Sequence, residues 1–341
     1  MSDSAPGDRL EDRVGTSRYW LGFLIGVDRW LLAAAILLAA FLALAVTSQL
    51  GLTPLRRIAT TQNGLRYLFS PFIGAIITGT SIVVTINQLV LSQELGAVGD
   101  QRNRMNNAVA FRTDIETLVD EAVSPPEPAA FLDGIVGAIR RRATRLDEQL
   151  VAEDSADGPE TVDRFVEEIR QNADMLSEEL SDAQFGTFGV LRAALDFNYS
   201  WKIYETRRLR ERHGESLSTE ATDTFEELID LLEAFGVARE HFKTLYFQWA
   251  LIDLSRALLY IAVPALVVIG ALVMYVDATT IYGATLGVDN LVWLSSAGFT
   301  VGLAPFVVFT VYILRIATVA KHTLAMGPFI LRETSREVEF E

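Results

Sequence analysis

The sequence predicts an all-α fold: four transmembrane helices, with an all-helical cytosolic bundle between helices two and three. Half of the 341 residues are hydrophobic, and most of them gather in four blocks instead of being spread as in soluble cores. Each block has roughly the 20 residues that a helix needs to cross a bilayer. The segment between the second and third blocks has helical periodicity and no alternation of period two. The blocks are Trp30–Leu50, Leu68–Leu91, Ala257–Val276 and Leu291–Leu314.

The charges beside the blocks predict the orientation. The loop 277–290 contains no Lys or Arg, whereas basic residues flank the hairpin on both sides: Arg239, Lys243 and Arg256 before it, Arg315 and Lys321 after it. Cytoplasmic flanks carry the excess of Lys and Arg, so we expect this loop to lie outside and both termini to be cytosolic in the cell membrane. The expected domains are a cytosolic N-terminal segment (1–29), transmembrane helices one and two (30–92), a helical cytosolic domain (93–250), transmembrane helices three and four (251–317) and a cytosolic tail (318–341).

Residues 1–29 are mostly polar, although the run 19–27 is apolar and could lie along the inner membrane surface. The first block is rich in Ala and Leu and has no polar stripe. We expect it to be a lipid-facing anchor.

The second block carries the clearest functional pattern. Its polar residues recur at steps of three and four, which places them on one helical face. A face toward lipid alone would gain nothing from them, so the face should meet protein, trapped water or a pore. Two interpretations stay open: a helix interface held by hydroxyl and amide hydrogen bonds, or a pore lined by one helix from each subunit of a ring. The residues are Thr78, Ser81, Thr85, Gln88 and Ser92.

The residue pattern of the cytosolic segment predicts a series of helices. One continues from the second block through Val119, bent at Gly96 and Gly99, and a second begins at the capping box Ser124–Glu127. After a turn at 154–159, a helix with an apolar stripe follows, then another at about 188–212. The last begins at Ser218 or Thr219, stops at Gly236 and resumes at Val237 into the third block.

Charge gives little information about partners. Acidic residues number 44 against 29 basic ones, for a net charge of −15, and Lys202, Lys243 and Lys321 are the three lysines. This surplus of carboxylate resembles the protein composition of salt-loving archaea. In molar salt the Debye length is about 3 Å, so long-range attraction is largely screened.

Four arginines follow a run of aromatic residues at helical spacing. Aromatic residues with arginines could bind nucleic acid, but inside an acidic bundle a salt-bridged helix face is the better interpretation, and we expect no nucleic-acid partner. If the run is functional, anionic lipid head groups are the nearer target. The arginines are Arg207, Arg208, Arg210 and Arg212.

No catalytic pattern is present. The absence of cysteine excludes disulfides, thiolate catalysis and cysteine metal sites. His213, His241 and His322 are too scattered for a metal motif, and the Gly-x-x-Gly at 96–99 follows no strand and lacks a phosphate-binding lysine. We therefore expect no enzyme, no metal and no cofactor.

The layout resembles bestrophin channels: four spans, both ends inside, a helical cytosolic domain between spans two and three, and a polar second span. The resemblance is one of topology, and the acidic calcium-binding cluster of that family has no counterpart in 315–341. The runs NQLVLSQELG at 87–96 and REHFKTLYFQW at 239–249 resemble uncharacterised membrane proteins of halophilic archaea.

The sequence thus predicts a homo-oligomeric integral membrane protein in contact with membrane lipids, with the second transmembrane helix lining a channel for small ions. The alternative is a membrane-anchored helical scaffold or sensor whose cytosolic bundle binds a protein partner.

Overall fold

The computed structural model describes residues 27–49, 56, 59, 64–152, 159–181, 188–213 and 217–322. The apolar run at 19–27, the turn at 154–159 and the C-terminal tail lie almost entirely outside these residues. The chain divides into two compact units. Among the described residues, unit 1 contains those of 96–247 and 319–322, and unit 2 contains those of 27–95 and 248–318.

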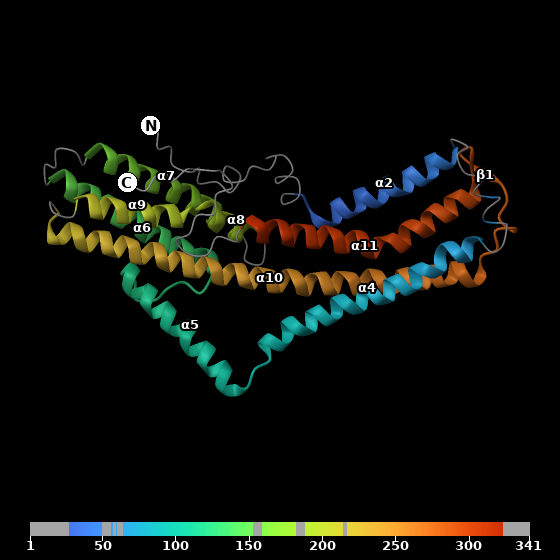
Figure 1. Ribbon diagram of the computed structural model, residues 1–341, viewed down its shortest axis with the longest axis horizontal. Coiled ribbons are helices and arrows are strands. Elements are labelled where there is room, and N and C mark those ends of the chain that lie inside the picture. The colour runs from blue at the N-terminus through green and yellow to red at the C-terminus, as the bar shows by residue number, and fades with distance from the viewer. Residues whose placement is uncertain are drawn as a thin grey trace, which may run out of the picture. The chain divides into compact units, whose positions relative to one another are not determined.

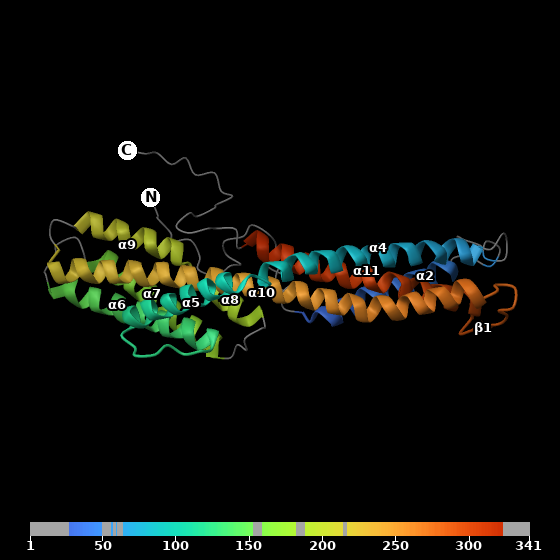
Figure 2. The same ribbon diagram turned by 90° about the horizontal axis from the view of Figure 1, so that it is seen from below.

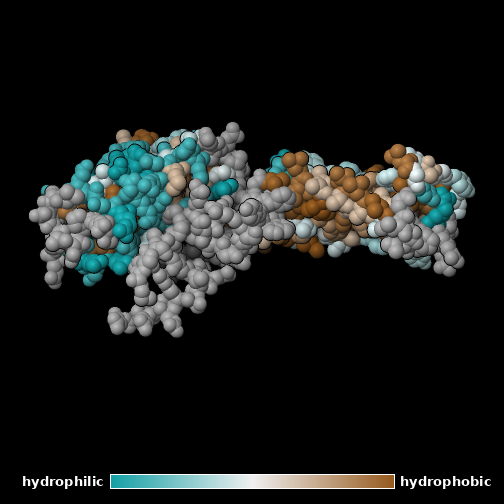
Figure 3. Space-filling model, turned by 90° about the horizontal axis from the view of Figure 1, so that it is seen from above, coloured by the Kyte–Doolittle hydropathy of each residue, from teal (hydrophilic) through white to brown (hydrophobic). Residues whose placement is uncertain are grey.

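Unit 2 is formed by four helices that are long and apolar enough to cross a membrane. They are α2 (Arg29–Gln49), α4 (Gly64–Glu94), the second part of α10 (Thr219–Tyr275) and α11 (Asn290–His322). Hydrophobic residues, brown in Figure 3, prevail on the visible face of this unit, and hydrophilic residues prevail on unit 1. The prediction of an all-α chain with four apolar helices of membrane-spanning length is confirmed, and the helices are compatible with a multi-pass membrane protein.

Helix α11 packs against each of the other three helices of unit 2 (Figures 1 and 2). Two glycines one turn apart allow the close approach. A Cβ atom at Gly298 would lie 2.5 Å from Leu272 of α10 and 2.9 Å from Phe69 of α4, and one at Gly302 would lie 2.8 Å from Phe72. These contacts agree with a packing role for the glycine pair.

A short hairpin connects α10 to α11, and the sequence pattern did not predict it. Strands β1 (Ala284–Thr285) and β2 (Val288–Asp289) pair antiparallel. The two turn residues, Leu286 and Gly287, both have positive φ (53° and 77°), as a type I′ hairpin turn requires. With only two residues in each strand, the period-two pattern is too short to recognise.

Unit 1 is an all-helical bundle. Its helices are α5 (Val98–Val119), α6 (Pro128–Ala152), α7 (Pro159–Ser181), α8 (Phe188–Asp196), α9 (Tyr199–His213) and the first part of α10. One apolar core joins them, with Leu132, Ile139, Ile169, Phe225 and Phe235 almost fully buried. Residues 98–110 of α5 are all exposed, Phe111 is partly buried against the core, and Ile115 is the first fully buried residue of the helix. In Figure 1 this part of α5 projects away from the other helices of unit 1.

Before α10, three helix boundaries differ from the sequence prediction. The helix after the second block is interrupted at 95–97, with Ala97 in an extended conformation. The 188–212 helix is also two helices, because the Asn198 side chain accepts a hydrogen bond from the Trp201 amide (3.4 Å) and caps α9. The third difference is the start of α6, which is at Pro128: the amide and hydroxyl of Ser124 both donate to Glu116 (2.8 and 2.9 Å) instead of capping the helix.

Gly236 does not end a helix, in contrast to the prediction, because α10 continues without interruption from Thr219 to Tyr275. The glycine makes room for a buried ring. A Cβ atom there would lie 2.5 Å from Cε2 and 3.0 Å from Cζ of Tyr199, whose ring packs against Phe235 and lies under the Arg239 guanidinium. A glycine required for close packing looks the same in sequence as one that stops a helix.

A buried arginine fixes the end of α5 against α6 and α10. Arg142 lies 2.7 Å from Asp120 and 2.5 Å from Glu227. Asp120 ends α5 in the left-handed conformation, and its hydrogen bond from Arg142 lowers the pKa of its carboxyl group. Because removal of one partner leaves a buried charge uncompensated, this cluster should be sensitive to mutation.

Two carboxyl groups meet between α6 and α7. The pKa of Asp147 is raised from 3.8 to about 6. The largest cause is burial of its carboxyl group, and the hydrogen bond with Asp163 and the negative charge of Asp163 add to it. Between about pH 4 and pH 6 the folded state therefore holds a proton that the unfolded chain releases. This protonated form stabilises the fold fully below about pH 4, and the contribution is lost as the pH rises through about 6.

The variant Asp147→Asn is expected to raise the melting temperature by a few degrees at pH 7.5, because the amide removes the repulsion without a titrating proton. At pH 4.5 the difference from wild type should be clearly smaller, because most of the folded chains then carry the proton on Asp147. Thermal denaturation followed by circular dichroism measures both values, with the exposed Glu178→Gln on α7 as the control. An equal effect of Asp147→Asn at both pH values would contradict the raised pKa of Asp147.

Candidate functional site on helix α4

All five residues of the predicted polar stripe lie on the exposed side of α4. We call Thr78, Ser81, Thr85, Gln88 and Ser92 the α4 stripe. Each residue advances about 100° around an α-helix, so Val83 lies nearly opposite Ser81 and Thr85. Val83 and Ile76 are buried against α10 and α11. The α4 stripe therefore points away from the core of its own chain.

The polar groups of the α4 stripe are satisfied unequally. Thr85 Oγ1 donates to the Ser81 carbonyl (2.9 Å), and Ser92 Oγ donates to the Leu89 carbonyl (2.7 Å). Such bonds to the helix's own backbone leave a hydroxyl oxygen available as an acceptor. No hydrogen bond joins the Gln88 carboxamide to another side chain within the described residues.

The exposed sides of α2 and α10 in unit 2 have a different character. They present large apolar side chains, such as Leu38 and Leu42 on α2 and Val263 and Val267 on α10. These are surfaces that hydrocarbon can cover without loss. The α4 stripe also has apolar neighbours, since Ile77, Ile82 and Leu89 are exposed beside it. It is thus a narrow polar line on an otherwise apolar surface.

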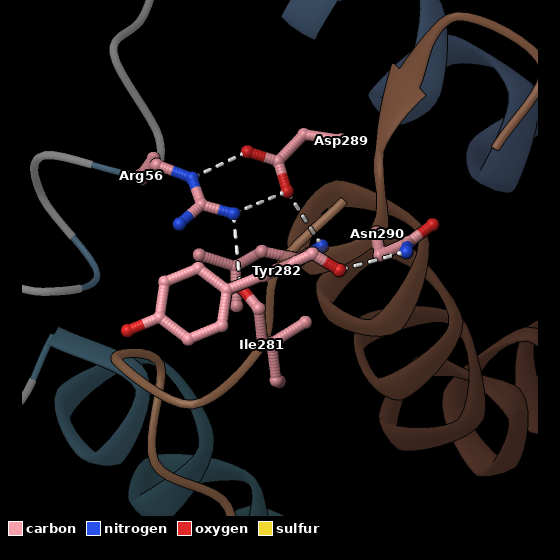
Figure 4. Close-up of polar contacts among 6 residues, drawn as sticks. Arg56, Ile281, Tyr282, Asp289 and Asn290 are labelled. Carbon is pink, nitrogen blue, oxygen red and sulfur yellow. Dashed lines mark hydrogen bonds and ion pairs between the residues drawn. The ribbon is translucent and has the colours of Figure 1, made fainter. Parts of the chain in front are cut away.

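The connection after α2 and the hairpin before α11 meet at an ion pair (Figure 4). Arg56 donates from Nε and Nη2 to the two carboxylate oxygens of Asp289 (2.6 and 2.9 Å), and Nη2 also donates to the Ile281 carbonyl (2.9 Å). The ion pair with Arg56 lowers the pKa of Asp289. The bidentate pair joins the connection after α2 to the hairpin before α11.

This pair was not predicted, because the partners are 233 positions apart. The signals were present: an arginine in a connection expected to lie outside, and an aspartate just before a helix. Asp289 also accepts from the Leu291 amide (2.9 Å) at the start of α11. Its position therefore serves both the helix start and the ion pair.

The arginine run on α9 is largely engaged within unit 1. Arg207 pairs with Glu233 (3.0 Å), Arg208 with Glu205 (3.4 Å) and Arg210 with Glu226 (3.7 Å), while Arg212 is exposed. Of the aromatic residues before them, Phe197 and Tyr199 are buried. The geometry favours a salt-bridged face over an open anionic-lipid surface. In the described part of the chain, no three His, Asp or Glu side chains gather as a metal site would require.

Comparison with known proteins identifies the family and no activity. Neither a search of curated proteins nor a search of solved structures finds a match. The model of one protein family, described as a family of unknown function (DUF7972), matches residues 1–341. The match covers the whole sequence, and the chain therefore belongs to this family of unknown function, DUF7972.

Proposed function

We propose that the chain is a homo-oligomeric integral membrane protein in which α4 from several copies lines a conduit for small ions. The observation that carries the proposal is the outward direction of the α4 stripe, opposite Ile76 and Val83. No catalytic reaction is assigned to the chain.

The energetic argument rests on Gln88. Transfer of an amide from water to a hydrocarbon that cannot form hydrogen bonds costs roughly 4 to 8 kcal/mol. The hydroxyls of Thr85 and Ser92 donate hydrogen bonds to backbone carbonyls, which lowers the free-energy cost of placing them in lipid. The Gln88 carboxamide has no hydrogen bond of this kind among the described residues. Water in a conduit, or a polar group of another copy, removes the cost. Lipid does not.

A ring of copies is proposed because the α4 stripe is directed away from the core of its own chain, whereas the cavity inside unit 2 is apolar. The cavity between α4, α10 and α11 has a volume of about 170 Å³ and is lined almost entirely by apolar side chains, including Val83, Leu258 and Phe306. It lies on the side of α4 away from the stripe. Several copies arranged around an axis can enclose a water-filled path between their α4 helices.

The orientation is part of the proposal: the connections that contain Arg56 and Asp289 face outside, and residues 93–250 face the cytosol. Arg56 is a basic residue on the proposed outer side, against the usual bias, but its ion pair with Asp289 neutralises it locally. A single cysteine introduced by Ser181→Cys should react with a membrane-impermeant maleimide only after cells are opened. Labelling of intact cells would reverse the orientation.

A membrane-anchored scaffold or sensor is the second candidate, and the exposed part of α5 favours it. Residues 98–110 are all exposed, and Met105 and Val109 are large apolar side chains among them. A helix gains most of its stability from burial of an apolar face, so a protein partner or another copy that covers this segment would stabilise it. The scaffold predicts no flux that depends on Thr85 or Gln88, which separates it from the channel.

The direct test of the proposal is whether α4 of one copy lies beside α4 of another. Because the chain contains no cysteine, one cysteine introduced at Thr85 can report that proximity by cross-linking. A cysteine on the exposed apolar side of α10 is the control.

A further inference from the structure

A groove between α6 and α7 of unit 1 is lined by four arginines. It has a volume of about 550 Å³. The other lining residues are two carboxylates and one threonine, and none of the seven is aromatic. The residues are Arg140, Arg141, Thr144, Arg145, Glu148, Arg170 and Asp174.

The arginines of this groove are only partly engaged by carboxylates. Arg140 forms a close ion pair with Asp174 across the groove. Arg145 is 3.9 Å from Glu227, which is already held by Arg142 at 2.5 Å, and Arg170 is 3.7 Å from Glu167. Arg141 donates to the Val119 carbonyl (3.2 Å). Each guanidinium has five N–H donors, so these contacts leave most of the donors to solvent or a ligand.

The groove is locally positive, although the whole chain is negatively charged. Four positive charges face two negative ones in the groove, whereas the protein carries a net charge of −15. Arg141 and Arg145 are also one helical turn apart, where like charges repel. An anion between them would remove this repulsion.

We propose that the groove binds a small soluble anion that carries two or more phosphate groups. Guanidinium groups match phosphate oxygens with paired hydrogen bonds, and several of them favour a multivalent anion. The volume lies in the range of small-molecule sites, roughly 300–1,000 Å³, and exceeds what a single phosphate needs. The absence of an aromatic lining residue means that the phosphates, not a stacked ring, are recognised.

The test is isothermal titration calorimetry of the full-length protein in nonionic detergent, with sodium tripolyphosphate as the probe, at 0.3 and 1 M KCl. We expect saturable binding at one site per chain. The double variant Arg141→Gln/Arg145→Gln should weaken the affinity by about tenfold or more, the scale of one lost charge-assisted hydrogen bond. It keeps the Arg140–Asp174 pair, and circular dichroism checks that the bundle is intact.

Two further variants test whether a loss of affinity comes from the groove and from its guanidinium groups. Arg207→Gln/Arg208→Gln removes the same charge from exposed, ion-paired positions on α9 that do not line the groove. It should leave the affinity within about twofold, because an exposed charge outside the site is screened by salt. Arg141→Lys/Arg145→Lys keeps the charge but loses the paired donors, so its affinity should lie between those of wild type and the Gln variant.

A lipid head group offers the same phosphate chemistry, so a parallel titration uses short-chain phosphatidylglycerol. Stronger binding of tripolyphosphate than of the lipid, with loss in the groove variant, supports the proposal. It is overturned if tripolyphosphate gives no saturable binding, if only the lipid binds, or if the groove and α9 variants have the same affinity.

Discussion

Replacement of Thr85 and Gln88 together by leucine is expected to lower ion flux by about tenfold or more, while the oligomer persists. Hydrophobic constrictions close a conduit by dewetting, and an added barrier of about 1.4 kcal/mol is enough for a tenfold decrease in rate. Because both side chains point away from the core of their own chain, the substitutions leave the packing of unit 2 unchanged.

The measurement is ion flux in proteoliposomes, together with the mass of the assembly in lipid nanodiscs. Thr310→Leu is the matched control: Thr310 is an exposed threonine of α11 that donates to the Phe306 carbonyl (2.8 Å), as Thr85 does to Ser81. Its flux should equal that of wild type. If the double variant conducts normally but its oligomer dissociates, the stripe is a helix interface with bonds of roughly 0.6–2 kcal/mol each, and the channel assignment fails.

Gly236→Ala is expected to destabilise unit 1, although alanine is the better helix former by about 1 kcal/mol. The new methyl group would lie 2.5 Å from Cε2 of Tyr199, and the ring cannot move freely because Phe235 and Arg239 pack against it. Overpacking of this kind costs roughly 1–3 kcal/mol. In a unit of this size each kcal/mol corresponds to about 2–4 °C of melting temperature.

The same substitution at Gly134 provides the control. Gly134 is inside α6, and a Cβ atom there would meet nothing within 4 Å. Gly134→Ala should therefore raise the melting temperature, whereas Gly236→Ala lowers it, in circular dichroism of the full chain. A rise for both variants would show that the Tyr199 ring yields without cost.

The apolar helices were predictable because their signal is local. Twenty apolar residues in sequence indicate a span whatever surrounds them, and the α4 stripe follows from the period of the helix alone. The stripe's direction was not predictable, since it depends on which face α10 and α11 cover. Burial of Ile76 and Val83 decides this, and both are as apolar as the exposed Ile77 and Ile82.

The missed features depend on contacts between different elements of the fold. The sequence predicts Ser124 to be a helix cap, but in the structure its amide and hydroxyl donate hydrogen bonds to Glu116. The sequence predicts that Gly236 ends a helix, but in the structure this glycine makes room for the Tyr199 ring. The Arg56–Asp289 pair joins two connections that no local pattern links. Each of these is a tertiary contact that overrides a local preference.

Cross-linking of a single cysteine at position 85 tests the central claim, that α4 of one copy faces α4 of another across a conduit. In membranes that contain Thr85→Cys, a flexible bis-maleimide should join copies into covalent dimers. Val263→Cys, on the exposed apolar side of α10, should remain monomeric under the same conditions. Monomeric Thr85→Cys, with or without cross-linking of Val263→Cys, would contradict the account, because the α4 stripe would then face lipid or a different partner.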